Sequence, residues 1–553
     1  MRKNKSLLGL LSGILLTLSW PYTGSITPLI FLALVPLLFV VDLNNKEGKT
    51  WGGIFFPVFI AMLVWNFGTT HWLFLVEEAM ATKIFSLVAP AVANALIMVL
   101  PWLLYAYFLR YLGSAKAFLG LIFIWLGYEY FHQNWELTWP WLLLGNVFSI
   151  RINWIQWYEF VGVQGGTLWV LWVNIAVYSL LIKLPKNALS KIYAQRGFWH
   201  VVLVITLPII WSQVIKHNTE IKGEKKKVLA IQPNIDPYTE KYNYGGYQSH
   251  LDGFIQEIKK HPEMDLALLP ETALQEPNRY GFDPNGKLIL NGIWENQFYR
   301  SQSISAIKRQ VVNPLGTAVL SGVSSMKIVP EQYPDKSVLR DISGDENLKM
   351  IAYNAAVYLD KKQLGVYHKS KLVPGVEITP YAWVFSNFKD LAMDLGGTTG
   401  SLGAQDSREV FKTPSGIVAA PVICYESVFG EYCTEYVEKG ANLICVLTND
   451  GWWQYSAGHK QHFAYARLRA IELRRDVIRS ANTGISCHIN QLGEVVSTLG
   501  YDKKGALVCE PHLNTELTVY ANMGDYLGRN ALFISALMLL MTFVRKVKSK
   551  SKL

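Results

Sequence analysis

Residues 416–426 read GIVAAPVICYE, and this apolar run stops at Cys424, which Tyr425 and Glu426 follow at once. A short run of small and β-branched residues without polar alternation is typical of a strand that is covered on both faces. The stretch therefore predicts a strand inside a layered α/β domain, with a thiol at the point where the strand ends.

Runs of the same kind recur through residues 225–515 and alternate with helical stretches, of which 247–260 and 462–475 are the clearest. Proline, glycine and asparagine separate them, as turns between elements require. The pattern favours an α/β sandwich. The other predicted strands are KKVLAIQPN (226–234), MDLALLPET (264–272), TAVLSGV (317–323), NAAVYLD (354–360), ANLICVLTND (441–450) and VIRSANTGIS (477–486).

The rest of the chain is strongly apolar. Of its 553 residues, 51% are hydrophobic and 17% are charged, against a usual charged share of about a quarter. Because a helix needs about 20 apolar residues to cross a hydrocarbon core, we expect about eight spans, the first two short enough to be tilted or partly interfacial. These are Leu7–Trp20, Thr27–Val41, Trp51–Val76, Ser86–Leu109, Ala117–Phe148 with a polar break, Val161–Ile182, Phe198–Ile215 and Leu527–Val544.

Lysine and arginine near span ends mark the cytoplasmic side of a membrane. With eight spans, these residues concentrate in both tails and in alternate loops, while the other short loops hold only Lys83 and Arg151. This asymmetry predicts that both tails are cytoplasmic and that residues 216–526 lie on the far side. The net charge of +10 is then mainly a topology signal, and a nucleic-acid partner is not expected.

All five cysteines lie within residues 216–526. An odd number in an oxidising compartment leaves at least one thiol unpaired. No cysteine or histidine spacing fits zinc, so no metal is expected, and His459 and His462 are predicted to have loop or supporting roles. Cys445 and Cys487 are predicted to be small core residues. The full set is Cys424, Cys433, Cys445, Cys487 and Cys509.

Three residues of this region have the chemistry for acyl transfer. Glu271 ends the run LALLPE, in which Pro270 fixes the turn. Lys369 stands where a strand enters a loop, and Cys424 ends its own strand. A thiol is a poor nucleophile until it ionises, and a nearby ammonium group and a carboxylate base lower that barrier. Each of these residues, taken alone, is more often structural, so the evidence for acyl transfer lies in the three residues together.

The stretch NWELTWPWLLLGN (134–146) interrupts an apolar segment with Glu136 and Pro140. Backbone at membrane depth needs cover from protein or water. Two interpretations stay open: a re-entrant or interfacial element beneath the active site, and an aromatic anchor at the membrane surface. Glu129 is likewise either a buried carboxylate with partners or part of a lipid pathway.

In chain order, Glu271, Lys369 and Cys424 resemble the catalytic set of the nitrilase superfamily, whose fold is an αββα sandwich. With seven predicted spans before this domain and one after it, the whole chain resembles the apolipoprotein N-acyltransferase family. The motifs that carry the resemblance are IQPNI (231–235), PET (270–272), YN (353–354), YHKSKLVPGVE (367–377), CYE (424–426), NDGWW (449–453) and HKQHFAYARLRAIELRR (459–475).

The resemblance implies that Cys424 is the nucleophile, Glu271 the general base and Lys369 the cation that stabilises the oxyanion. The family more often has Trp at the position of Tyr242, and VPFGE where this chain has VPGVE (373–377). The spacing to Glu377 favours Lys369 over its neighbour Lys371. The other implied site residues are Glu377, Tyr425 and Glu426 in supporting roles, and Tyr242, Asn354 and Trp452 in substrate binding.

The resemblance also implies a transmembrane domain over residues 1–220, an extracytoplasmic nitrilase-like (carbon-nitrogen hydrolase) domain over 221–520, and a C-terminal helix with a basic cytoplasmic tail over 521–553. The implied reaction moves an acyl chain from a phospholipid, with phosphatidylethanolamine as the expected donor, to the α-amino group of the diacylglyceryl-cysteine of apolipoproteins. It proceeds through a cysteine thioester without a cofactor and is the last step of lipoprotein maturation. The implied location is the bacterial inner membrane, with the catalytic domain on the periplasmic side.

Two other functions stay open. One is a membrane-anchored nitrilase-type amidase, although a single span would serve as an anchor. The other is a non-enzymatic membrane binding protein with an inactive nitrilase domain, although the Glu, Lys and Cys set is intact. Trapping of a thioester with a labelled phospholipid separates all three.

Overall fold

The computed structural model describes residues 4–48, 51–184, 189–241, 245–284, 288–342, 345–381 and 401–550. The chain forms two compact units. The first comprises Met1–Phe74, Lys83–Thr219 and Thr518–Leu553, and the second comprises Leu75–Thr82 and Glu220–Leu517.

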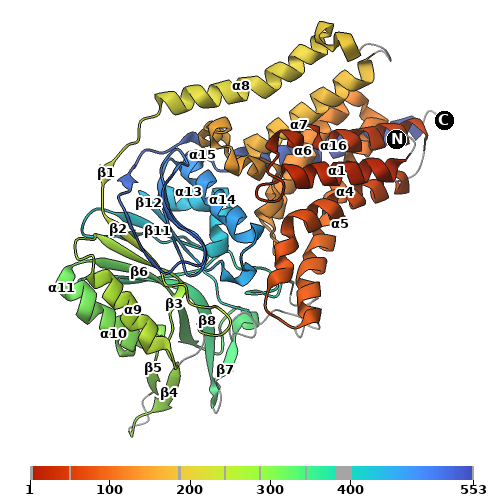
Figure 1. The fold of residues 1–553 in the computed structure, drawn as a ribbon. Coiled ribbons are helices and arrows are strands. Elements are labelled where there is room, and N and C mark those ends of the chain that lie inside the picture. The colour runs from red at the N-terminus through yellow and green to blue at the C-terminus, as the bar shows by residue number, and fades with distance from the viewer. Residues whose placement is uncertain are drawn as a thin grey trace. The chain divides into compact units, whose positions relative to one another are not determined.

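The first unit consists of apolar helices, drawn mainly in red, orange and yellow in Figure 1. Several have a proline in their interior, which is tolerated in membrane helices because neighbouring groups satisfy the freed carbonyls. The helices are α1 (Lys5–Ser19), α2 (Ile30–Ala33), α3 (Val35–Lys46), α4 (Gly52–Thr70), α5 (Met80–Leu112), α6 (Ser114–His132), α7 (Tyr158–Lys183), α8 (Arg196–Asn218), α15 (Val519–Met523) and α16 (Tyr526–Lys550).

The helix count agrees with the expected number of about eight spans. The 15-residue α1 and the 19-residue α6 match two of the predicted spans. In the described part of the chain, six further segments are long and apolar enough to cross a membrane: Thr27–Lys46, Gly52–Leu75, Met80–Leu112, Tyr158–Lys183, Arg196–Asn218 and Tyr526–Ser549.

Glycines let α1 and α4 pack closely. A Cβ on Gly9 would lie 2.1 Å from the carbonyl oxygen of Pro57, and one on Gly13 would lie 2.6 Å from that of Ala61. Small residues at such crossings allow membrane helices to approach, since lipid provides little hydrophobic drive between them. Helix α8 differs, because only 6% of its most apolar stretch is buried, and its ribbon runs along the edge of the helices of this unit (Figure 1).

The predicted span Ala117–Phe148 is wrong in its second half. Helix α6 ends at His132, and short 3₁₀ turns follow over Pro140–Leu142, Leu144–Ile150 and Ile152–Trp154. The carboxylate of Glu129 holds this segment to the bundle: it accepts from Leu144 N at 2.9 Å, Thr167 Oγ1 at 2.7 Å and Trp125 Nε1 at 3.0 Å. Glu129 is therefore a buried carboxylate with partners.

The second unit contains two main sheets. Strands β2, β3 and β6 run parallel in one sheet, as β11, β12 and β13 do in the other. The seven-stranded sheet has the order β16 (Gly505–Cys509), β2 (Val228–Gln232), β3 (Leu266–Leu274), β6 (Ala318–Val329), β8 (Asp345–Leu359), β7 (Arg340–Ile342), with β9 (Leu364–His368) also paired to β8. The six-stranded sheet has the order β10 (Phe411–Lys412), β11 (Val418–Ile423), β12 (Leu443–Thr448), β13 (Asp476–Ala481), β14 (Ser486–Ile489), β15 (Val495–Leu499).

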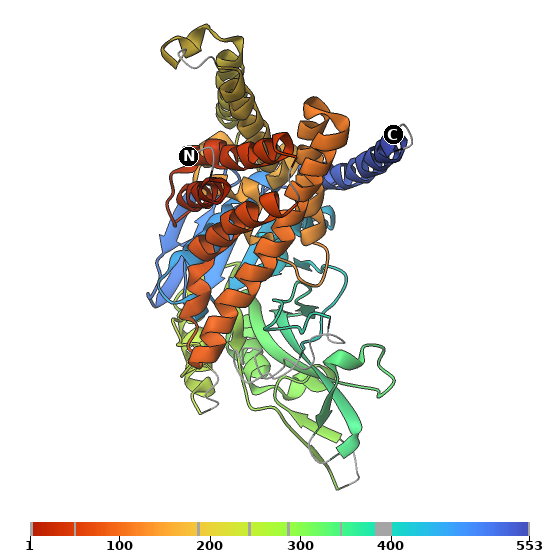
Figure 2. The same ribbon diagram turned by 90° about the vertical axis from the view of Figure 1, so that its right-hand side faces the viewer.

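Smaller pairings complete the unit. Strand β1 (Glu224–Lys225) pairs with β17 (His512–Leu513), and the hairpin of β4 (Arg279–Phe282) and β5 (Leu288–Asn291) extends beyond the seven-stranded sheet in both ribbon views (Figures 1 and 2).

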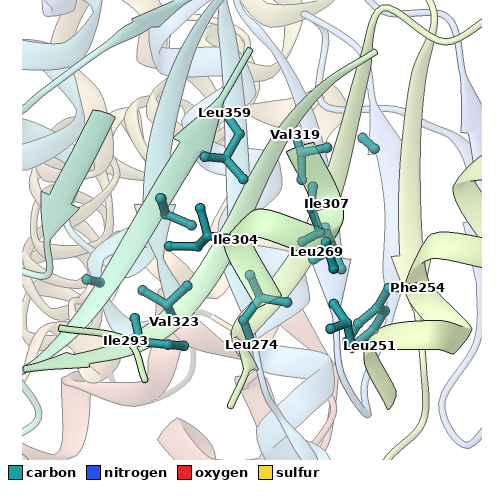
Figure 3. Close-up of a cluster of buried hydrophobic side chains, with 14 of the residues drawn as sticks. Leu251, Phe254, Leu269, Leu274, Ile293, Ile304, Ile307, Val319, Val323 and Leu359 are labelled. Atoms are coloured by element: carbon teal, nitrogen blue, oxygen red, sulfur yellow. The ribbon is translucent and has the colours of Figure 1, made fainter. Parts of the chain in front are cut away.

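Helices cover the outer faces of both sheets. Leu251 and Phe254 of α9 (Tyr247–Lys259) and Ile304 of α10 (Gln302–Ile307) pack with Leu269 and Val319 of the seven-stranded sheet (Figure 3). Helices α13 (Gly430–Glu438) and α14 (Ala457–Leu473) pack on the six-stranded sheet. The sheets face each other, and the predicted αββα sandwich is confirmed.

Two element boundaries differ from the sequence prediction. Helix α14 begins at Ala457 rather than at residue 462, because Ser456 caps it and its Oγ accepts from Gly458 N at 3.2 Å. The run 477–486 is not one strand: β13 ends at Ala481, and a turn that contains Gly484 precedes β14.

Candidate active site

Glu271 lies within β3 rather than at its end, at a point where the strand is irregular. The pairing with β6 shifts register here, and Thr272 has a left-handed φ of 46°. The chain bulges over Gly322 of β6, where a Cβ would lie 2.5 Å from Pro270 O and from Thr272 N. Gly322 permits this close approach because it has no side chain.

Both carboxylate oxygens of Glu271 accept hydrogen bonds. Oε1 accepts from Asn354 Nδ2 at 2.8 Å and from Lys369 Nζ at 3.2 Å. Oε2 accepts from Asn449 N at 3.1 Å. Burial raises the pKa of Glu271, but the ammonium groups of Lys369 and Lys241 and the Asn354 amide outweigh burial, so the net pKa is lowered. The group is therefore ionised at neutral pH and can accept a proton.

Lys369 directly follows β9 and is buried, with 1% of its side chain exposed. Its Nζ lies 2.8 Å from Glu377 Oε1 as well as beside Glu271. Burial lowers the pKa of Lys369, but Glu377, Glu271 and the Cys424 thiol raise it by more, so the net pKa is well above its ordinary value. One buried cation thus stands between two carboxylates.

Asn354 of β8 connects these groups. Its Nδ2 donates to Glu271 and, at 2.9 Å, to Glu377 Oε1. Its carbonyl oxygen accepts from Lys369 N at 2.8 Å. Glu377 is held further, since its Oε2 accepts from Val373 N at 2.8 Å. These contacts support a positioning role for Asn354, and its predicted contact with substrate stays a prediction.

Cys424 follows β11 as the first residue of a 3₁₀ turn and has a φ of 49°. A non-glycine residue in this region is uncommon and is found at functional sites. Burial and then Glu271 raise the pKa of the Cys424 thiol, and Lys369 opposes them only in part. The resting group is therefore a thiol, and attack by sulfur needs a base that takes the proton.

Two groups fix the main chain at Cys424. The carbonyl oxygen of Cys424 accepts from Ser427 Oγ at 2.8 Å and from His462 Nε2 at 3.1 Å. His462 is itself held by Asp450, whose Oδ1 lies 2.9 Å from Nδ1, and Asp450 is paired with Arg479. This agrees with the supporting role predicted for His462.

Glu426 links the segments that carry the lysine and the cysteine. It is fully buried, its Oε2 accepts from Ile423 N at 2.7 Å and its Oε1 from Ser370 N at 2.7 Å. Tyr367 and Tyr432 each donate to Oε1 at 2.6 Å. Glu426 therefore fixes the residues next to Lys369 and Cys424.

The remaining predicted residues are placed as follows. Tyr425 is buried and packs edge-on against Phe429, with ring centroids 5.1 Å apart. Trp452 is half-buried, and its carbonyl oxygen accepts from Tyr238 at 2.9 Å. Lys371 lies over the Phe429 ring and not between the carboxylates. Tyr242 lies outside the described residues.

Sequence reasoning missed Lys241. Its Nζ donates to the carbonyl oxygen of Glu271 at 2.9 Å, and the residue is 5% exposed. It stands in a polar stretch, DPYTEKYNYGG (236–246), that has no strand or helix period to mark it.

All five cysteines are free and buried. Within the described residues, no three histidine, cysteine, aspartate or glutamate side chains cluster as metal ligands would.

Comparisons with known proteins match two family models to separate parts of the chain. The family model for carbon-nitrogen hydrolases matches residues 227–523, and the model for the N-terminal domain of apolipoprotein N-acyltransferase matches residues 12–176. The domain and the apolar helices together define a multi-pass membrane acyltransferase of the carbon-nitrogen hydrolase class.

Curated relatives narrow the assignment. The apolipoprotein N-acyltransferase of Chlorobaculum tepidum is 28% identical over 98% of this chain and 96% of its own length. That of Bradyrhizobium diazoefficiens is 37% identical over 74% of this chain and 70% of its own length. The chain belongs to the apolipoprotein N-acyltransferase family. Among solved structures, Saccharomyces cerevisiae Nit3, a member of branch 10 of the nitrilase superfamily, matches 56% of this chain and 96% of its own, with 15% identity and a TM-score of 0.36.

Proposed function

We propose that the protein transfers an acyl chain from a phospholipid to the α-amino group of the N-terminal diacylglyceryl-cysteine of apolipoproteins, through a thioester on Cys424. The relatives named for this activity support the proposal. The observation that carries it is the buried set of groups in which Lys369 lies between Glu271 and Glu377, with the charges of Glu271 and Lys369 acting on the Cys424 thiol.

In the first half-reaction, Glu271 takes the thiol proton while Sγ of Cys424 bonds to an ester carbonyl carbon of the donor. The carbonyl oxygen becomes an oxyanion, which the Lys369 ammonium and nearby main-chain N–H groups stabilise. The C–O bond to glycerol then breaks, and Glu271 returns the proton to the leaving lysophospholipid. Phosphatidylethanolamine, attacked at its first acyl position, is the donor we propose.

In the second half-reaction, the free α-amine of the lipoprotein attacks the thioester carbonyl. The C–N bond forms, the C–S bond breaks, and Glu271 accepts the proton of the amine before the thiol regains it. The product carries an N-linked third acyl chain. Asn354 and Glu377 keep Glu271 and Lys369 in place through both steps.

We further propose that the protein resides in the bacterial inner membrane, with both tails cytoplasmic and the catalytic unit on the periplasmic side. The concentration of lysine and arginine in the tails and in alternate short loops supports this orientation.

A phospholipid labelled in one acyl chain tests the donor. Label that is bound to Cys424 and released by hydroxylamine supports the thioester. A membrane-anchored amidase would instead acylate Cys424 from a simple amide and leave the phospholipid intact, which would contradict the proposal.

A further inference from the structure

Lys241 is a second buried cation beside the reacting groups. Its Nζ donates to the main-chain oxygen of Glu271 at 2.9 Å, so it contacts the same residue as Lys369 but from the backbone side. Burying an ammonium group costs free energy unless it is paired and bonded. A lysine kept in this position, with 5% of the residue exposed, therefore needs a compensating charge nearby.

The charges of the site balance only when Lys241 is counted. Glu271 and Glu377 are the negative groups, and Lys369 is the positive group that lies between them. Without Lys241 these three would leave one net negative charge in a buried site. When Glu271 takes the proton of Cys424, the negative charge moves to sulfur and the total is unchanged. The site then has two negative groups, the Cys424 thiolate and Glu377, and only one positive group, Lys369, unless Lys241 supplies the second positive charge.

Among the described residues, the Asp450–Arg479 pair does not supply that positive charge. Asp450 acts on the thiol, but it is paired with Arg479 and adds no net charge. Burial lowers the pKa of Lys241 to about 8, with Lys369 adding to that effect and with Glu271 and the Cys424 thiol opposing it. Lys241 is therefore mainly charged at neutral pH and loses its charge as the pH rises through about 8.

We propose that Lys241 is a positioning residue of the active site, which fixes the main chain of the general base and supplies the positive charge that balances the site when Cys424 ionises. The proposal rests on the nucleophilic role of Cys424 in the proposed function. It does not depend on which acyl donor the protein uses.

The test uses the full-length protein in detergent and needs no acyl donor. The rate at which iodoacetamide alkylates Cys424 is measured against pH, with peptide mass mapping to separate the other cysteines. The variants are Lys241→Met, which removes the charge, and Lys241→Arg, which keeps it. The matched control is Lys260→Met, at an exposed lysine that pairs with Glu257 on the surface of the same unit.

We expect Lys241→Met to slow alkylation at neutral pH by about tenfold, because loss of a nearby opposite charge raises a thiol pKa by about 1 or more. Lys241→Arg and Lys260→Met should stay near the wild-type rate. In the wild type the rate should rise less steeply above about pH 8, where Lys241 loses its proton, and Lys241→Arg should remove this break, because guanidinium is not deprotonated.

An unchanged rate in Lys241→Met would overturn the proposal. Equal slowing of alkylation in Lys241→Arg and Lys241→Met would also overturn it, provided that thermal unfolding shows both variants to be folded. Such a result would mean that the shape of the Lys241 side chain matters and its charge does not. If Lys241→Met does not fold, the pH break in the wild type and its loss in Lys241→Arg decide the matter. Wild-type protein that takes no acyl chain from phospholipid, with the alkylation differences intact, would refute the proposed donor and leave the role of Lys241 standing.

Discussion

Gly322 of β6 lies against the main chain of Glu271: a Cβ at Gly322 would stand 2.6 Å from Glu271 Cα. The backbone atoms of the bulge leave no room for a Cβ at position 322, so only glycine fits there. The position of Glu271, the proposed general base, therefore depends on a glycine of the neighbouring strand.

Gly322→Ala should push Glu271 out of line with Lys369 and Cys424. Because a displacement of about 1 Å can cost about 10²-fold in rate, we expect acylation of Cys424 to fall by that order. Gly281→Ala is the matched control, since a Cβ there meets open space. Time-resolved intact-mass measurement of the acyl-enzyme reads both variants. Equal rates in the two would show that the bulge does not position Glu271.

Only one of the five cysteines should carry the acyl chain. We expect Cys424→Ala to form no acyl-enzyme, whereas Cys433→Ala and Cys445→Ala, like Cys487→Ala and Cys509→Ala, should still form it. The latter four thiols are buried, so their loss should lower stability by at most about 2 kcal/mol. Intact mass after exposure to phospholipid checks each variant. An adduct that persists in Cys424→Ala would place the nucleophile elsewhere.

The carboxylate of Glu271 should be needed in both half-reactions. Glu271→Gln keeps the shape of the side chain but cannot accept a proton, so acylation and transfer should each fall by about 10² to 10⁴-fold. Lys369→Met should be impaired at least as severely, because it removes the cation that stabilises the oxyanion and leaves Glu271 and Glu377 facing each other. Glu426→Gln should be milder at the first step, since Glu426 holds main-chain N–H groups beside Lys369 and Cys424 and is not the proposed proton acceptor. Normal acylation in Glu271→Gln would refute the shared-base mechanism.

Reporter fusions test the proposed orientation. A reporter that is active only in the periplasm should be silent when fused after Lys191 and active when fused after Lys225. These positions flank the predicted span Phe198–Ile215, so the two results must differ if the span crosses the membrane. Activity after Lys191, or silence after Lys225, would reverse the orientation.

Strands with a strong local signal could be predicted from the sequence. β2, β11 and β12 are short apolar runs buried along nearly their whole length, and the thiol at the end of β11 marks the site. The sequence does not predict β15, because it is short and largely exposed. It does not predict β5 either, because this strand has only four residues, of which Leu290 alone is buried.

The features of the site that the sequence does not predict depend on contacts between distant parts of the chain. Lys241, which the sequence does not mark, contacts a main-chain oxygen 30 positions away. A supporting role is predicted for His462, but its contact with the Cys424 carbonyl oxygen, 38 positions away, is not. Neither contact leaves a local pattern in the sequence. Pro270 suggests a turn and so predicts that the strand ends at Glu271, whereas Gly322 of the neighbouring strand lets β3 continue to Leu274.

The most direct test of acyl transfer through Cys424 is a two-step intact-mass measurement on the wild-type protein. Exposure to phosphatidylethanolamine should add the mass of one acyl chain at Cys424. Addition of a diacylated lipopeptide with a free α-amine should then remove that mass from the protein and add it to the peptide nitrogen. A lipopeptide that gains the acyl chain while Cys424 never carries it, or an acylated Cys424 that passes its chain only to water, would contradict the account.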